Sequence, residues 1–291
     1  MSMYDELKMK VFHSGSRVTM FIGINVLIFL FTAIIGVFCF LFAQPNFIEP
    51  IIRDYFAAPT YLPKLLFRFW TPFTYIFFHD GFLHILFNML WLYWIGRILE
   101  DFINGKKFTF IFLGGGIAGA LFYIICYNLF PAYSNSVELS SIVGASAGVT
   151  AVIIATAVLL PDYTISLLLI GPVKLKWIAI VYLVIDIISI VGPNSGGYLS
   201  HLGGAIFGFF FIKSLQRGAD WSKPFEDLFK PQSKLKVVSK NPNKASIPKN
   251  ETPNQVAVDE ILDKISKSGY DKLTKREKEI LFNASKNDEK K

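Results

Sequence analysis

Charged residues are scarce in this 291-residue chain, and they are scarcest in its first three quarters. They make up 18% of the sequence, whereas hydrophobic residues make up 53% and the mean hydropathy is +0.45. Of the 29 Lys and Arg only 12 precede residue 216, as do 10 of the 22 Asp and Glu. A soluble domain of this size does not need so much apolar surface. The composition therefore argues against a soluble enzyme and favours a protein with several membrane spans.

Cysteine is nearly absent as well, which limits the chemistry available to the chain. The two cysteines, Cys39 and Cys126, both lie in apolar runs and show none of the spacings typical of metal sites. We expect them to be small core residues, and we expect no metal and no cofactor. The formal net charge of +7 comes mostly from the residues after Leu215. Attraction to anionic lipid headgroups accounts for such a basic segment without a nucleic-acid partner.

Six apolar runs predict an all-α membrane protein with six transmembrane helices. The first run starts after Arg17 and is too long for the apolar core of a signal peptide, so we expect it to be the first span. The connection over residues 44–70 holds four prolines among aromatic residues, which is typical of a segment lying in the membrane interface. The predicted spans are residues 18–43, 77–98, 108–130, 139–160, 177–191 and 198–215.

The loop charges predict the orientation of these spans. Lys and Arg occur before the first span, between the second and third, between the fourth and fifth, and after the sixth. The opposite side carries Arg53, Lys64 and Arg68 in its first loop and no basic residue in the next two. Because basic residues accumulate on the cytoplasmic side, we expect a multi-pass protein with both termini in the cytoplasm.

Composition divides the chain into four parts. These are an N-terminal lead (1–17), the membrane domain (18–215), a basic linker (216–254) and a short C-terminal segment (255–291). In the last part Thr274 and Glu277 form a capping-box pattern, and Gly269 is a plausible helix stop. Apolar residues recur there at helical spacing, at Val258, Ile261, Leu262 and Ile265. We therefore expect a small helical hairpin, a cytoplasmic tail in this topology.

Four polar residues from three predicted spans fall at a similar depth. Ser146 lies about seven residues into the fourth span, roughly 10 Å below its start. His84 and Asn88, four residues apart, share one face of the second span, and His201 lies about one turn into the sixth. All three spans start on the outer side in the predicted topology. We therefore expect the four side chains to converge beneath the outer surface.

Each of these residues also has a structural interpretation. Gly144 and Gly148 flank Ser146 as a GxxxG pattern, which alone indicates helix packing, and a lone histidine can be satisfied by a carbonyl. However, ionisable side chains within a membrane are costly and tend to mark functional sites. The coincidence of all four residues at one depth therefore favours a site.

These groups are suited to acyl transfer. Ser146 would attack a peptide carbonyl, and His201 would take its proton and later return it to the leaving amine. The Ser146 backbone N–H, near a helix start, and the side chains of His84 and Asn88 would stabilise the oxyanion.

Three further polar residues have open roles. Asp186 is the only acid well inside a span, and we favour a hydrogen bond to a neighbouring helix or the first loop while keeping it as a site candidate. His79 and Asp80 open the second span, where His79 either lines a water entrance or is simply solvated.

Residues 70–215 resemble the rhomboid family of intramembrane serine proteases. The family pattern is found as His84-x-x-x-Asn88, Gly144-x-Ser146 and His201-x-x-Gly204-x-x-x-Gly208, with His79 and Glu100 also in family positions. The resemblance implies a six-helix bundle, a Ser146–His201 dyad without an acid, and cleavage of other proteins' membrane helices near the outer face. It also implies transmembrane protein substrates within the lipid bilayer, and the expected location is a bacterial plasma (inner) membrane.

The chain departs from the family pattern at three positions. Ala147 stands where glycine commonly follows the serine, and Thr71 stands where arginine usually follows Trp70. Thr150 lies one turn after the serine, where an aromatic residue often stacks on the histidine. The alternative function is a catalytically silent rhomboid-like protein that binds membrane clients, although such a protein has no need of both Ser146 and His201.

Overall fold

The computed structural model describes residues 15–167, 170–228 and 255–288 of the chain. It forms two compact units, residues 1–231 and residues 232–291, which are described separately below. Most of the predicted N-terminal lead and most of the predicted basic linker lie outside the described residues.

The first unit is mostly helical and has one helix in each of the six predicted spans. Four of these helices are long and apolar enough to cross a membrane, and α8 is a shorter apolar helix. The chain is therefore an integral membrane protein. The six helices are α2 (Arg17–Leu41), α6 (Phe82–Phe102), α7 (Gly105–Leu129), α8 (Ser146–Leu159), α9 (Leu175–Ser189) and α10 (Ser195–Gln216).

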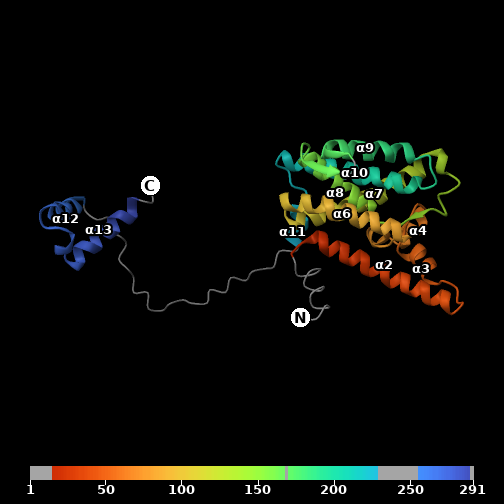
Figure 1. Ribbon diagram of the computed structural model, residues 1–291, viewed down its shortest axis with the longest axis horizontal. Coiled ribbons are helices and arrows are strands. Elements are labelled where there is room, and N and C mark those ends of the chain that lie inside the picture. Colours follow the sequence, from red (N-terminus) through yellow and green to blue (C-terminus); the bar gives the residue numbers. More distant parts are fainter. Residues whose placement is uncertain (1–14, 168–169, 229–254, 289–291) are drawn as a thin grey trace. The chain divides into compact units, whose positions relative to one another are not determined.

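Helix α8 lies at the centre of the bundle, packed closely against α7 and α10 (Figure 1). It is buried on all sides over its first three turns, where most side chains are small. Glycines of the neighbouring helices permit this approach: a methyl group at Gly204 or Gly208 of α10 would overlap the carbonyl oxygens of Ala147 and Ala151. The GxxxG pattern of α10 therefore packs the helix that carries His201 directly against the helix that begins at Ser146.

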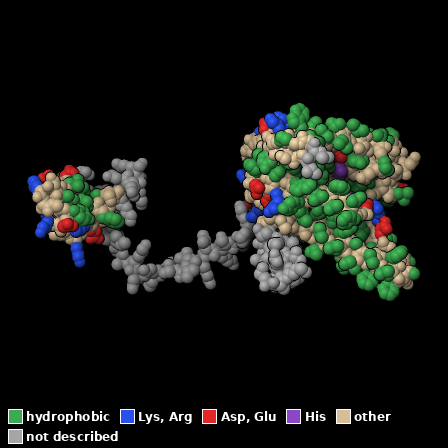
Figure 2. Space-filling view, viewed as in Figure 1, with side chains coloured by type: hydrophobic (Ala, Val, Ile, Leu, Met, Phe, Trp, Pro, Cys, Tyr) green, Lys and Arg blue, Asp and Glu red, His purple; other side chains and the backbone are tan. Residues whose placement is uncertain are grey.

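Helix α2 packs mainly on α6 at the outside of the bundle (Figure 1). Its outward side chains are apolar and exposed, as expected for a helix in contact with lipid. Its N-terminus is fixed by Glu100 at the end of α6, which accepts hydrogen bonds from the Ser16 hydroxyl (2.6 Å) and the Arg17 backbone N–H. Hydrophobic side chains also cover the middle of the unit in Figure 2, with Lys, Arg, Asp and Glu gathered toward its two ends.

The fourth helix starts later than the sequence predicted. Residues 139–160 were expected to be helical, but α8 begins at Ser146. The residues before it run into the unit as extended chain, in which β2 (Ser141–Ile142) pairs antiparallel with β1 (Ala58–Pro59). Gly144 follows with φ of +137°, and its N–H donates to the Tyr75 carbonyl at 3.0 Å. Neighbouring backbone thus satisfies the polar groups of this apolar segment, so no helix is required.

The connection between α2 and α6 contains short elements rather than a solvated loop. These are α3 (Ile48–Tyr55), β1, α4 (Leu62–Phe67), α5 (Thr71–Thr74) and a 3₁₀ turn η1 (Tyr75–Phe77). Arg68 holds the connection together: its guanidinium lies 4.3 Å from the Tyr55 ring centroid and bonds to the Asp54 carbonyl. Thr71, one of the three departures from the family pattern, is buried and donates to the Arg68 carbonyl at 2.8 Å. The Thr71 hydroxyl is therefore satisfied by a backbone carbonyl three residues earlier in the same turn.

Two smaller features complete the first unit. Between α8 and α9 the strands β3 (Thr164–Leu167) and β4 (Gly171–Lys174) pair antiparallel, with residues 168–169 outside the described part. After α10 the short helix α11 (Lys223–Leu228) follows, where Lys107 of α7 forms ion pairs with Asp220 (3.0 Å) and Glu226 (3.1 Å). The all-α prediction therefore missed two short strand pairs.

The described part of the second unit, residues 255–288, is a helical hairpin. Helix α12 (Gln255–Ser268) is followed by Gly269 with φ of +81°, a 3₁₀ turn η3 (Tyr270–Lys272) and α13 (Lys275–Asp288). Thr274 and Glu277 make the reciprocal bonds of a capping box: the Thr274 N–H donates to the Glu277 carboxylate at 2.6 Å, and the Glu277 N–H donates to the Thr274 hydroxyl at 3.4 Å.

The hairpin is expected to lose stability in acid through Glu277. The Lys264 ammonium, 2.7 Å away, and the Thr274 donors lower the pKa of this carboxyl from 4.5 to about 2. A carboxyl whose pKa is lower in the folded state stabilises it above pH 4.5 and loses that contribution as the pH falls toward about 2. Hydrogen exchange of peptides from residues 255–288 of the full chain, corrected for intrinsic rates, should show protection falling over this range.

A Glu277→Gln variant is the control for this titration. It keeps an acceptor in the capping box but cannot titrate, so its protection should change less over the same range. An identical acid response in both proteins would contradict the assignment to Glu277.

Candidate active site

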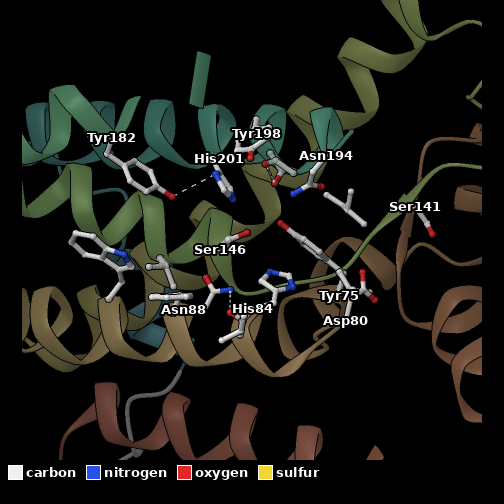
Figure 3. Close-up of a pocket in the computed structure, with 18 residues that line it drawn as sticks. Tyr75, Asp80, His84, Asn88, Ser141, Ser146, Tyr182, Asn194, Tyr198 and His201 are labelled. Atoms are coloured by element: carbon white, nitrogen blue, oxygen red, sulfur yellow. Dashed lines mark hydrogen bonds between the residues drawn. The ribbon is translucent and has the colours of Figure 1, made fainter. Parts of the chain in front are cut away.

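A cavity of about 560 Å³ lies between α6, α8, α9 and α10. All four residues predicted to converge from three spans line it: His84 and Asn88 from α6, Ser146 from α8 and His201 from α10 (Figure 3). The structure therefore brings together groups that are more than 100 residues apart in sequence. The rest of the wall mixes aliphatic residues with aromatic and polar ones, the latter including Tyr75, Asp80, Trp91, Tyr182, Asn194 and Tyr198.

Ser146 and His201 face one another across this cavity. Ser146 is the first residue of α8, so its half-buried side chain leaves the helix at its N-terminal end. In Figure 3 the Ser146 side chain lies below the imidazole of His201, within the same cavity. The Nδ1 atom of that ring bonds to groups of α9 on the side away from Ser146, so Nε2 is the nitrogen turned toward the serine.

Asp186 of α9 is a hydrogen-bond partner of His201. Its two carboxylate oxygens lie 3.1 and 3.2 Å from His201 Nδ1, and the residue is only 3% exposed. The sequence favoured a bond from Asp186 to a neighbouring helix as a structural contact and kept a site role open. The contact is to a neighbouring helix, α10, but the partner is the histidine of the site itself. The sequence signal for this pairing is that Asp186 and His201 lie at a similar depth from the outer ends of the fifth and sixth predicted spans.

Tyr182 supplies the aromatic ring that position 150 lacks. It lies on α9, one turn before Asp186, and its ring stacks on His201 with centroids 6.1 Å apart and planes 25° apart. Its hydroxyl lies 3.0 Å from the Thr150 hydroxyl and 3.4 Å from His201 Nδ1. Sequence reasoning missed Tyr182, although two polar residues four positions apart on an otherwise apolar helix mark one face.

On the opposite wall, α6 presents an imidazole and an amide. Asn88 is buried and donates one Nδ2 hydrogen to the His84 carbonyl at 2.9 Å. The His84 ring lies against Gly144, where a Cβ atom would be only 2.8 and 2.9 Å from the ring atoms Cε1 and Nε2. Glycine is therefore required at residue 144 both for its positive φ and for this close approach.

His79 occupies a place that differs from both sequence-based interpretations. It does not line the cavity; its Nε2 accepts a hydrogen bond from the Ala145 N–H at 3.4 Å. Its Nδ1 is buried without a hydrogen-bond partner among the described residues, so the predictions of a water entrance or a solvated ring are wrong. His79 supports the segment that leads into Ser146, whereas its neighbour Asp80 lines the cavity and pairs with Arg53 at 3.2 Å.

The N-terminus of α8 lies at the cavity, with Ser146 in its wall. No side chain caps this helix end, and the first hydrogen bond into it runs from the Val149 N–H to the Ala145 carbonyl. The N–H groups of residues 146–148 precede that bond, as at any helix start. Ala147 does not obstruct them: its methyl group packs against Gly119 of α7, and the residue is absent from the cavity wall.

A serine, an imidazole held through Nδ1 and uncapped helix donors are the groups that acyl transfer requires. By contrast, no cluster of three or more His, Cys, Asp or Glu suited to a metal ion occurs within the described residues.

Comparison with known proteins identifies the domains of the chain. The sequence profile of the Rhomboid domain matches residues 66–217, and that of DUF6576, a family of unknown function, matches residues 249–287. The chain is 41% identical over 49 residues to rhomboid protease GlpG of Salmonella newport (strain SL254) and of Salmonella heidelberg (strain SL476). This stretch is 17% of the chain and spans 18% of the length of these relatives.

Proposed function

The chain belongs to the rhomboid family, and we propose that it is an intramembrane serine endopeptidase that cleaves transmembrane segments of other membrane proteins. Ser146 is the nucleophile and His201 the general base and acid. The observation that carries the proposal is the placement of Ser146 at the start of α8, facing His201 in one cavity among apolar helices.

The proposed reaction has two halves. Ser146 Oγ attacks the scissile carbonyl carbon while His201 Nε2 takes the hydroxyl proton. The tetrahedral intermediate collapses, the C–N bond breaks, and His201 returns the proton to the leaving amine. Water, activated by the same imidazole, then hydrolyses the acyl ester and restores the serine. The cavity, at about 560 Å³, has room for this water.

The oxyanion of each intermediate is stabilised by donors on two sides. The backbone N–H groups at the start of α8 lie beside Ser146, and the positive end of the helix dipole favours negative charge there. His84 and the second Nδ2 hydrogen of Asn88 approach from α6. Donors of this kind contribute roughly 10²–10³ in rate each.

The proposed substrate is a membrane helix that unwinds locally. A peptide carbonyl inside a helix is already hydrogen-bonded, so residues that weaken the helix below the cut favour exposure of the bond. Small residues at the cut favour close approach of the scissile carbonyl to Ser146 at the start of α8. We place the cavity near the outer face, with all six helices spanning the bilayer and both termini cytoplasmic, on the distribution of basic residues.

Labelling with a fluorophosphonate tests the proposal directly. The reagent phosphonylates a serine that a neighbouring base activates, so the native protein in detergent should carry one adduct, located at Ser146 by peptide mass spectrometry. The Ser146→Ala variant should carry none. A native protein that folds but forms no adduct and cleaves no reporter helix would instead be a client-binding member of the family.

A further inference from the structure

We propose that Asp186 is a positioning residue for His201, so that this protein uses a Ser146–His201–Asp186 chain carried by three helices. The inference rests on the proposed function and goes beyond it, because the family resemblance implies a dyad without an acid.

The geometry places the carboxylate where an acid orients a catalytic histidine. Both oxygens lie within 3.2 Å of Nδ1, the ring nitrogen turned away from Ser146. An Nδ1–H donated to Asp186 fixes the tautomer in which Nε2 carries a lone pair toward the serine. The same carboxylate stabilises the imidazolium that forms when His201 takes the serine proton.

The burial of Asp186 points in the same direction. Its neighbours Ile185, Ile187 and Ile188 are each more than half exposed on the lipid side of α9, whereas Asp186 is turned into the bundle at 3% exposure. An acid at membrane depth costs about 2.5–3.5 kcal/mol on insertion scales, so a purely structural link between α9 and α10 would be made at lower cost by a neutral pair. The electrostatic attraction between Asp186 and His201 is strongest when the imidazole becomes charged, which happens during the reaction.

Tyr182 provides the comparison within the same helix. It also contacts His201, through its ring and through a hydroxyl 3.4 Å from Nδ1, but a phenol cannot balance the charge of an imidazolium as a carboxylate does. Within the described residues, four ionisable side chains face His201: Asp186 and Tyr182 from α9, Tyr198 on its own helix and His84 across the cavity. Asp186 is the acid among them that bonds directly to the ring.

The test compares Asp186→Asn and Asp186→Glu with the native full-length protein in lipid vesicles. In the Ser-His-Asp triad of serine proteases, aspartate to asparagine lowers kcat about 10⁴-fold with the geometry intact. We expect Asp186→Asn to lower kcat for a reporter helix by about 10²- to 10⁴-fold, with KM nearly unchanged. Asp186→Glu should restore part of the rate, and Tyr182→Phe, which keeps the ring, should lose far less.

The histidine tautomer gives a readout that is measured on the native protein itself. With 15N-labelled histidine, the native protein should show His201 protonated at Nδ1, the signal being assigned by its loss in His201→Ala. Protonation at Nε2 in the native protein would overturn the proposal. So would an Asp186→Asn variant with native kcat, or one whose loss is explained by a raised KM and a lower unfolding temperature. If the native protein neither labels nor cleaves, the proposed function itself fails, and this inference fails with it.

Discussion

Replacing Ser146 or His201 with alanine is expected to lower cleavage of a reporter transmembrane helix by about 10⁴-fold or more. Nucleophile and base act as one unit, so removing either leaves only the contribution of the oxyanion donors and of binding. Ser146 is a half-buried residue at the first position of α8, so the Ser146→Ala variant should keep the native fold. His201 bonds to Tyr182 and Asp186 of α9, so the fold of His201→Ala is checked separately by its unfolding temperature. Gel-based cleavage of a reporter by the purified variants in vesicles, with their unfolding temperatures, measures both expectations.

Ser141→Ala is the matched control for this pair of variants. Ser141 lines the same cavity from β2 but belongs to the extended segment before α8 rather than to the helix end facing His201. This variant should keep most of the activity. Substantial cleavage by either Ser146→Ala or His201→Ala would contradict the proposed pair, and equal loss in all three would indicate general damage to the cavity.

Replacing Gly204 with valine is expected to be the most disruptive change outside the cavity. A Cβ at this position would overlap the carbonyl oxygen of Ala147, and backbone cannot yield as a side chain does. Overpacking of this kind typically costs about 1–3 kcal/mol, so the unfolding temperature should fall. The larger effect should be on cleavage: α10 must move away from α8 and carry His201 with it, and a displacement of about 1 Å can cost about 10²-fold in rate.

Gly36→Val in α2 serves as the control for Gly204→Val. Gly36 is also a helical glycine in an apolar run, but a Cβ there would meet only the Asn46 side chain, at 3.9 Å. Thermal unfolding and reporter cleavage should both remain near native values. Equal effects of the two substitutions would show that loss of glycine, rather than the contact between α8 and α10, is responsible.

The sequence predicted much of the helical architecture because hydropathy reports the transfer of side chains into lipid. Each of the six apolar runs contains a helix, and the family resemblance drawn from His84, Ser146 and His201 is confirmed by the domain match. Periodicity also placed Asn88 on the same face as His84, since residues four apart share a helix face. Each of these inferences uses the hydropathy or periodicity of a single segment.

The errors arose where one segment depends on another. Hydropathy cannot distinguish an apolar helix from an apolar extended chain whose backbone bonds to neighbours, so the predicted fourth span began at residue 139 rather than at Ser146. His79 was expected at the outer surface because it opens a span, but the chain folds back so that the ring is half-buried, with its Nε2 against the Ala145 N–H.

What the sequence determined by itself is therefore the membrane class, the segments that become helices and the residues able to carry out acyl transfer. The tertiary structure decided which of these residues meet, and it brought Tyr182 and Asp186 of α9 against the ring of His201. The physical reason is that hydropathy and periodicity are properties of one segment, whereas a contact between helices depends on the rotation, depth and separation of both. Here the glycines of α7 and α10 set that separation, by letting both helices pack against the backbone of α8.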